Sequence, residues 1–146
     1  EVKELTKELT DFLGFKHKHT AFMIGVGSLG GALIQDTGLA HYGLNVVAGF
    51  DVNPKLVGTN IKGIPIYDIN DLAQQQKKYD VSIAVLTVPV DNAQNAADHA
   101  IACGIKALWN FTPYRIKAPA DVVIQNTSIY AHLAVMYNRL ETNKHK

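Results

Sequence analysis

A closely spaced set of glycines near the start of the chain constrains the fold more than any other feature. Gly25, Gly27 and Gly30 have the G-x-G-x-x-G spacing and directly follow the apolar run 21–24. This spacing allows a tight turn from a strand into a helix, a close approach of the backbone to a pyrophosphate, and close packing of the helix on the strand. The N–H groups at the start of a helix also favour an anion. The stretch 21–31 therefore predicts a nucleotide-phosphate cradle.

Length and composition indicate one domain of ordinary globular type. A chain of 146 residues can bury a substantial core, and its 47% hydrophobic and 18% charged residues indicate neither disorder nor a membrane protein. No run reaches the roughly 18 consecutive apolar residues of a transmembrane helix. The net charge of +1 lacks the basic excess of a domain that binds nucleic acid by itself. We therefore expect no membrane partner and no DNA held by this segment alone.

Cysteine and histidine usage argues against a disulfide and a metal site. Cys103 is the single cysteine, which excludes an internal disulfide and a multi-cysteine zinc site and fits a reducing cytoplasm. His17 and His19 lack carboxylate or cysteine companions, so we expect them to be solvated. The sequence begins at Glu1 without a signal peptide. We predict a cytoplasmic protein with no bound metal.

Apolar runs that alternate with helical patterns predict the remaining fold. The expected strands are 21–26, 45–50, 63–67, 81–88, 105–109 and 122–125. The expected helices are 28–42, 71–79, one from Asp91 or Asn92 to Gly104, and one from Ser128, with a polar loop over 55–62 and a polar tail from Glu141. This order predicts an α/β, Rossmann-type, doubly wound and mostly parallel sheet that binds ligands at its carboxyl edge.

The residues before this domain have an amphipathic helical pattern. The apolar positions, three or four apart, are Val2, Leu5, Leu9, Phe12 and Leu13. Such a helix either packs on the domain that follows or connects it to a further domain. We expect 1–19 to be a connector helix and junction, 20–127 the Rossmann dinucleotide-binding domain, and 128–146 a C-terminal helix and tail.

Asp51 lies at the end of the second expected strand, 21 positions after Gly30. A carboxylate about 20 residues after the glycine motif binds the adenosine ribose hydroxyls in dinucleotide-binding folds. It would repel the additional phosphate of NADP, which favours NAD or NADH as the cofactor. The alternative is that Asp51 only opens the turn 51–54, as aspartates often do. The glycines at the matching distance upstream favour ribose binding.

Several residue groups together resemble one family, the Rex redox-sensing transcriptional repressors of bacteria. They follow one another in the expected order from Gly25 to Pro113. The groups are Gly25–Gly30, Ala48–Asp51, Val57–Gly58, Gly63–Tyr67, Leu86–Pro89, Gly104–Lys106 and Asn110–Pro113. The pattern ending at Gly14 also resembles the connector that follows the family's winged-helix domain, and the last helix resembles its dimer-forming C-terminal helix.

The resemblance implies a homodimeric sensor of NADH and NAD, whose ligand state sets the angle between two N-terminal winged-helix domains on operator DNA. This chain lacks that DNA-reading domain, so we expect a fragment of a longer protein rather than a relative that has lost the reader. The implied cofactor-binding residues are Gly25, Val26, Gly27, Ser28, Leu29 and Gly30 at the pyrophosphate, Asp51 with Val52 at the adenosine ribose, and Thr87, Val88, Pro89, Asn110, Phe111, Thr112 and Pro113 toward the nicotinamide. The alternative for the last group is ordinary strand-end loop structure.

Two other functions stay open. A dehydrogenase needs an acid or base near the nicotinamide, but His41, His99 and His132 fall within expected helices, so we predict no catalytic residue and no enzyme. A coenzyme A-binding domain uses a related glycine turn. Asp51 argues against it, because the ribose of coenzyme A is phosphorylated.

Two expectations concern the sensing mechanism. An apolar nicotinamide pocket would disfavour the NAD cation, so we expect NADH to bind more tightly. The last helix either covers the sheet of its own subunit, which is usual for a terminal amphipathic helix, or is exchanged between subunits, as the resemblance implies. Its apolar residues are Ile129, Leu133, Met136, Tyr137 and Leu140.

Overall fold

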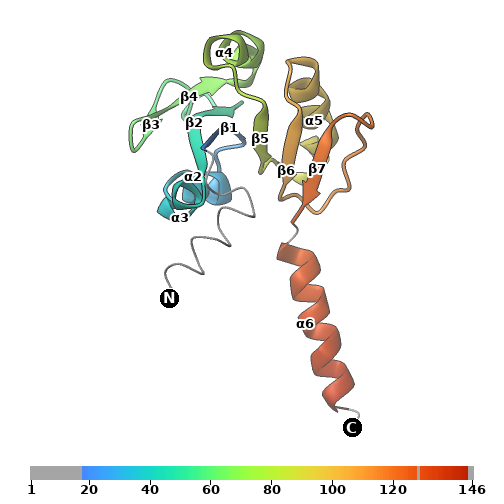
Figure 1. Cartoon of the computed structure of the whole chain (residues 1–146). Helices are drawn as coiled ribbons and strands as arrows, with labels where there is room; N and C mark the ends of the chain where they lie inside the picture. Colours follow the sequence, from blue (N-terminus) through green and yellow to red (C-terminus); the bar gives the residue numbers. More distant parts are fainter. Residues whose placement is uncertain (1–17, 128, 145–146) are drawn as a thin grey trace, which may run out of the picture.

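A seven-stranded sheet organises the part of the chain that the computed structural model describes, residues 18–127 and 129–144 (Figure 1). The strands are β1 His19–Ile24, β2 Leu44–Asp51, β3 Asn60–Ile61, β4 Ile64–Asp68, β5 Ile83–Leu86, β6 Ala107–Asn110 and β7 Val123–Asn126. Their order is β3-β4-β2-β1-β5-β6-β7, and all neighbours pair in parallel except β3 with β4. The strand order reverses between β1 and β5, which is where such sheets bind ligands. The predicted fold class is confirmed.

Helices pack on both faces of this sheet, except for the last one, which extends away from it. They are α2 Ser28–Ile34, α3 Thr37–His41, α4 Leu72–Tyr79, α5 Ala93–Ala102 and α6 Ile129–Lys144, with short 3₁₀ turns η1 Ile69–Asp71 and η2 Val90–Asn92. Phe22 of β1 packs in a core cluster with residues of α4 and α5, and its neighbour Met23 packs in a second cluster with Ile34 of α2. Successive strand residues point to opposite faces. The first strand is therefore buried on both sides, as its unbroken apolar run predicts.

The helix predicted over 28–42 is wrong in one respect, because the structure divides it into α2 and α3. The Gln35 amide donates to the Ala32 and Gly31 carbonyls and closes α2. The Asp36 carboxylate then accepts the Gly38 N–H at 2.7 Å and caps α3. An aspartate that caps a new helix competes with continuation of the preceding one.

Several boundaries also differ from the predictions. The loop predicted over 55–62 contains β3, whose edge is supported by the Ile66 N–H donating to the Thr59 carbonyl at 2.9 Å. His19 belongs to β1 rather than to the junction. No helix separates β6 from β7. The helix α6 continues through the predicted polar tail to Lys144. The predicted connector helix and the predicted start at Ser128 lie outside the described residues.

The helix α6 extends away from the sheet (Figure 1). Its exposed apolar side chains are Leu133, Val135, Met136, Tyr137 and Leu140. Of the two alternatives for the last helix, these exposed side chains do not fit the one in which they cover the sheet of their own subunit. Within 18–127 and 129–144, no helix has the length and apolar character needed to cross a membrane.

Candidate functional site

Gly25 is held in a conformation that favours glycine. Its φ is 91°, and a Cβ there would lie 2.9 Å from the carbonyl carbon and oxygen of Thr87. Its N–H donates to the Phe50 carbonyl of β2 at 2.8 Å, and its carbonyl accepts the Thr87 hydroxyl at 2.6 Å. The turn after β1 is therefore tied to the strands on both sides.

The other two glycines of the motif have different roles. A Cβ at Gly30 would overlap the Gly25 carbonyl, so this glycine lets α2 pack against the turn. A Cβ at Gly27 would meet no atom within 4 Å. Gly27 is the N-cap of α2, where no side chain of the described residues caps the helix. The first N–H groups of a helix have no partner within it, so the turn leaves donors and open space together.

Asp51 ends β2 beside this turn. One carboxylate oxygen accepts the Val26 N–H at 2.7 Å, and the other accepts the Asn53 N–H at 2.9 Å. The contact with Asn53 is the turn-opening role foreseen as the alternative. Each carboxylate oxygen has a second acceptor site, so the same side chain can still accept a hydroxyl of a ligand. The structure is compatible with both roles.

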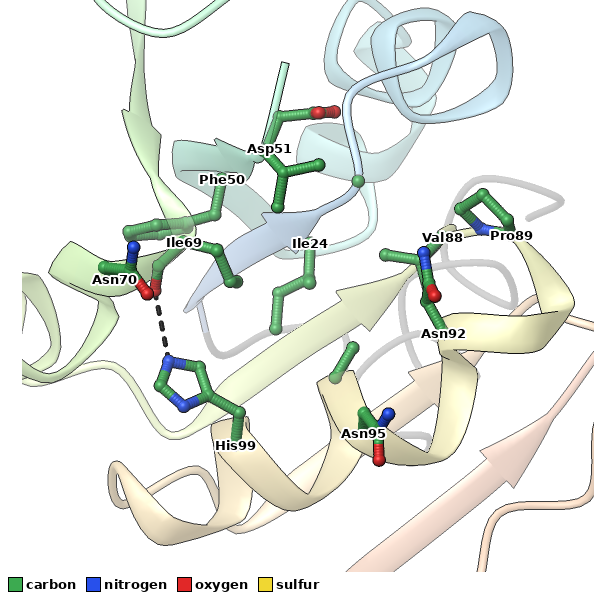
Figure 2. A pocket seen from close by; sticks show the side chains of 13 residues that line it. Ile24, Phe50, Asp51, Ile69, Asn70, Val88, Pro89, Asn92, Asn95 and His99 are labelled. Atoms are coloured by element: carbon green, nitrogen blue, oxygen red, sulfur yellow. Dashed lines mark hydrogen bonds between the residues drawn. The ribbon is translucent and has the colours of Figure 1, made fainter. Parts of the chain in front are cut away.

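Two adjoining cavities open at the carboxyl edge of the sheet. One of about 360 Å³ lies between the end of β2, η1 and α5 (Figure 2), and one of about 790 Å³ lies over the glycine turn and the ends of β5 and β6. Both sizes fall in the usual range of ligand pockets. Six residues line both cavities, namely Gly25, Asp51, Val52, Val88, Pro89 and Asn92.

The larger cavity brings together most of the remaining predicted site residues, which are Gly27, Leu29, Thr87, Phe111, Thr112 and Pro113. Four predicted residues line neither cavity, namely Val26, Ser28, Gly30 and Asn110. Val26 supplies the N–H that Asp51 accepts, and Gly30 supports the turn from behind. Asn110 is completely buried below the loop 111–113.

The smaller cavity contains residues that the sequence analysis missed. Figure 2 shows His99 reaching from α5 to the Ile69 carbonyl, with a ring nitrogen 3.1 Å from that oxygen. Asn70 from η1, Asn92 from η2 and Asn95 from α5 also line it. Ile69 and Asn70 follow a parallel strand directly, which is a signal that could have found them. The residues of α5 share a helix face at spacings of three and four, which points to the cavity only once the fold is known.

Two titratable groups outside the cavities have shifted pKa values. The Tyr79 hydroxyl, 3.4 Å from that of Tyr67, is the main cause that raises the pKa of Tyr67, and desolvation adds to it. Burial raises the pKa of the Cys103 thiol, which follows α5. Among the described residues no three His, Cys, Asp or Glu side chains gather as metal ligands would. Among the described residues, the two cavities thus combine a largely apolar lining with one carboxylate, that of Asp51, and the glycine turn.

The sequence of this chain matches known proteins. A family profile described as a CoA binding domain matches residues 16–114. The redox-sensing transcriptional repressor Rex of Bacteroides thetaiotaomicron is 59% identical over 146 residues, which are 100% of this chain and 66% of that protein. The chain thus spans about 66% of the length of this curated relative.

Solved structures agree with the sequence matches. RSP, a Rex-family repressor, has been crystallised with β-NADH, and that structure matches with a TM-score of 0.90 at 34% identity, covering 99% of this chain and 70% of RSP. The complex of RSP with β-NAD⁺ and operator DNA matches with a TM-score of 0.91, covering 99% of this chain and 66% of RSP. Fold, glycine turn and sequence lead to one conclusion: the chain belongs to the Rex family of redox-sensing transcriptional repressors.

Proposed function

We propose that this chain is the NAD(H)-sensing part of a redox-controlled transcriptional repressor. The observation that carries the proposal is the position of Asp51 between the two cavities, beside the glycine turn. In this arrangement the smaller cavity takes the adenine, Asp51 the ribose, and the turn 25–30 the pyrophosphate. The loops 87–90 and 111–113 then enclose the nicotinamide end. The bound dinucleotide supplies the redox difference to be sensed, since its nicotinamide is a cation in NAD⁺ and neutral in NADH.

The acidic side chain selects the dinucleotide. Asp51 has its two oxygens on backbone N–H groups, which hold the carboxylate at the junction of the cavities. A ribose hydroxyl can donate to it, whereas the additional phosphate of NADPH or of coenzyme A would bring like charges together. NAD(H) is therefore the ligand that this site favours, although the profile matched by residues 16–114 takes its description from coenzyme A.

The larger cavity favours the neutral ring. Its lining includes Leu29, Leu56, Val88, Pro89, Val90, Phe111 and Pro113, and among the described residues that line it Asp51 is the single acidic one. A cation placed against apolar side chains loses hydration without a compensating partner. A ligand shifts a conformational equilibrium only through its different affinities for the two states. NADH therefore binds more tightly than NAD⁺ and drives the response.

Calorimetric titration tests the ligand. NADH is expected to bind, NADPH to bind more weakly, and coenzyme A to leave NADH in place. The matched variant is Asp51→Asn, which keeps one side-chain oxygen and removes the charge. In this variant the difference between the affinities for NADH and for NADPH is expected to become smaller. Displacement of NADH by coenzyme A, or NADPH binding as tight as NADH binding in the parent chain, would overturn the assignment.

The exposed apolar residues of α6 support a homodimer. Leu133, Met136, Tyr137 and Leu140 are 39% to 55% exposed and recur at helical spacing, a pattern typical of a helix that packs on a partner. We propose that α6 is exchanged between two subunits and that operator DNA is read by a winged-helix domain outside this segment, in the cytoplasm. A chain ending at Thr127 is then a monomer in light scattering. A dimer of unchanged mass would count against exchange.

The competing function is a dehydrogenase. His99 does line a cavity, but the smaller one, where its ring meets the Ile69 carbonyl. Among the described residues that line the larger cavity, Asp51 is the one ordinary acid or base. The nicotinamide end thus lacks the positioned proton donor that hydride transfer to a carbonyl requires. We expect bound NADH to persist in the presence of small keto acids, and bound NAD⁺ to persist in the presence of small hydroxy acids. Conversion of either cofactor faster than in the absence of these acids, followed by the absorbance of NADH, would contradict this.

A further inference from the structure

Asn110 is a buried amide with a full set of hydrogen bonds. Its side-chain nitrogen donates to the Tyr114 carbonyl at 2.7 Å and to the Asn126 side-chain oxygen at 2.9 Å. Its oxygen accepts the N–H of Thr112 at 3.0 Å and the hydroxyl of Thr112 at 2.7 Å. A primary amide offers two donors and two acceptor sites. All four are used, and the side chain is 0% exposed, so it holds one arrangement of the groups around it.

A second connection runs beside the first. The Trp109 indole N–H donates to the Thr127 hydroxyl at 3.0 Å, and the Thr127 N–H donates to the Asn110 carbonyl at 2.8 Å. The Trp109 ring also packs on Phe111, with 4.6 Å between ring centroids. The ends of β6 and β7 are therefore joined by side chains as well as by the strand pairing.

These connections link the larger cavity to the start of α6. Phe111 and Thr112 line that cavity on one side and contact Trp109 and Asn110 on the other. Asn126 and Thr127 end β7, and α6 begins at Ile129, two positions after Thr127 in the sequence. A displacement of the loop 111–113 cannot leave Asn126 and Thr127 in place unless these hydrogen bonds break.

We infer that Trp109 and Asn110 are positioning residues that transmit the state of the ligand cavity to α6. The inference rests on the proposed function, since it assumes that a dinucleotide contacts Phe111 and Thr112. Closure of the loop 111–113 on the ligand moves the amide of Asn110 and the ring of Trp109, and both reset the end of β7. The direction of α6 then follows the occupancy of the cavity. Coupling between sites of this kind typically changes affinities by about 5-fold to 150-fold.

The first test uses Trp109 itself, because it is the single tryptophan of the 146-residue chain. Saturation with NAD⁺ is expected to shift the tryptophan emission of the parent chain. In the Thr127→Val variant, which removes the acceptor of the indole N–H, this shift is lost or at least halved, while Thr127→Ser retains it. If calorimetry shows that the parent chain is saturated with NAD⁺ and its tryptophan emission does not change, the inference is overturned.

The second test measures α6 directly and avoids the buried amide, whose replacement would threaten folding. Spin labels are placed on Lys77→Cys in α4 and Asn143→Cys in α6, both exposed, in a Cys103→Ser background. Labelled chain is diluted with unlabelled chain, so that distances within one chain dominate. NADH is expected to shift the label-to-label distance in the parent chain.

The matched variants are Asn126→Ala, which removes the oxygen that Asn110 contacts, and Asn126→Asp, which keeps it. Asn126 is exposed, so either change is compatible with folding, which circular dichroism checks. The distance shift is expected to vanish in Asn126→Ala and to persist in Asn126→Asp. A full shift in an Asn126→Ala chain that binds NADH would overturn this inference and leave the proposed function intact. Absence of NADH binding to the parent chain would overturn both.

Discussion

The Thr87 hydroxyl offers the sharpest test of how the glycine turn is held. It donates to the Gly25 carbonyl at 2.6 Å across the gap between β5 and the turn. Thr87→Val keeps the shape of the side chain and removes this donor. A carbonyl that loses its partner costs about 1–3 kcal/mol when buried. Because Thr87 is half-buried, we expect the lower end, about 1 kcal/mol, which lowers the melting temperature by about 4 °C for a chain of this size.

The same change should weaken NADH binding. If the hydrogen-bonded conformation of the glycine turn is the one that binds NADH, destabilising it by about 1 kcal/mol reduces the affinity for NADH by up to about fivefold. Urea unfolding measures the stability, calorimetry measures the affinity, and Thr87→Ser is the control that keeps the hydroxyl. Two results would refute the reasoning: an unchanged unfolding midpoint in Thr87→Val, or an equal loss in Thr87→Ser.

Three further predictions concern other parts of the molecule. Gly27→Ala should lower the free energy of unfolding by no more than about 1 kcal/mol, yet bind NADH poorly in calorimetry. Gly30→Ala should lower the free energy of unfolding by about 1–3 kcal/mol in urea, because its Cβ would overlap a backbone carbonyl. Equal effects of the two changes on stability and on binding would contradict the separate roles of the two glycines. Contact with the Tyr79 hydroxyl raises the pKa of Tyr67, so above about pH 10 the unfolded chain loses a proton that the folded chain keeps, and stability falls as the pH rises. The fall should be shallower in Tyr67→Phe, with no difference between the variants' slopes below about pH 9. Burial raises the pKa of the Cys103 thiol, so alkylation near about pH 8 should be slower in the folded chain than in urea, since the thiolate reacts; equal rates would contradict the burial.

The features that could be predicted from the sequence depend on short distances along the chain. The glycine spacing determines the turn, and Gly25 and Gly30 occupy the positions where a Cβ would collide. Asp51 reaches the turn because the second strand ends beside it. The small residues Ala93, Ala97 and Ala100 lie three or four positions apart and form the buried face of α5.

The features that could not be predicted depend on competition or on distant pairs. Asp36 can either continue a helix or cap a new one, and in the structure its carboxylate accepts the Gly38 N–H and caps α3. His99 enters the site only because η1 lies beside α5, 30 positions away in the sequence. Asn110 belongs to one of the residue groups that resemble the Rex family, but its role below the cavity depends on Asn126 of the neighbouring strand. Such pairs become visible only when the strand order is known.

Titration of the chain with NADH and with NAD⁺ in the same buffer shows whether the site distinguishes the two redox states. We expect this difference because the apolar lining around Phe111 and Val88 disfavours the charged ring of NAD⁺. Isothermal calorimetry is expected to show at least a tenfold lower dissociation constant for NADH, which corresponds to about 1.4 kcal/mol. Equal dissociation constants for the two forms would contradict redox sensing by this site, since a site without this difference cannot report the redox state.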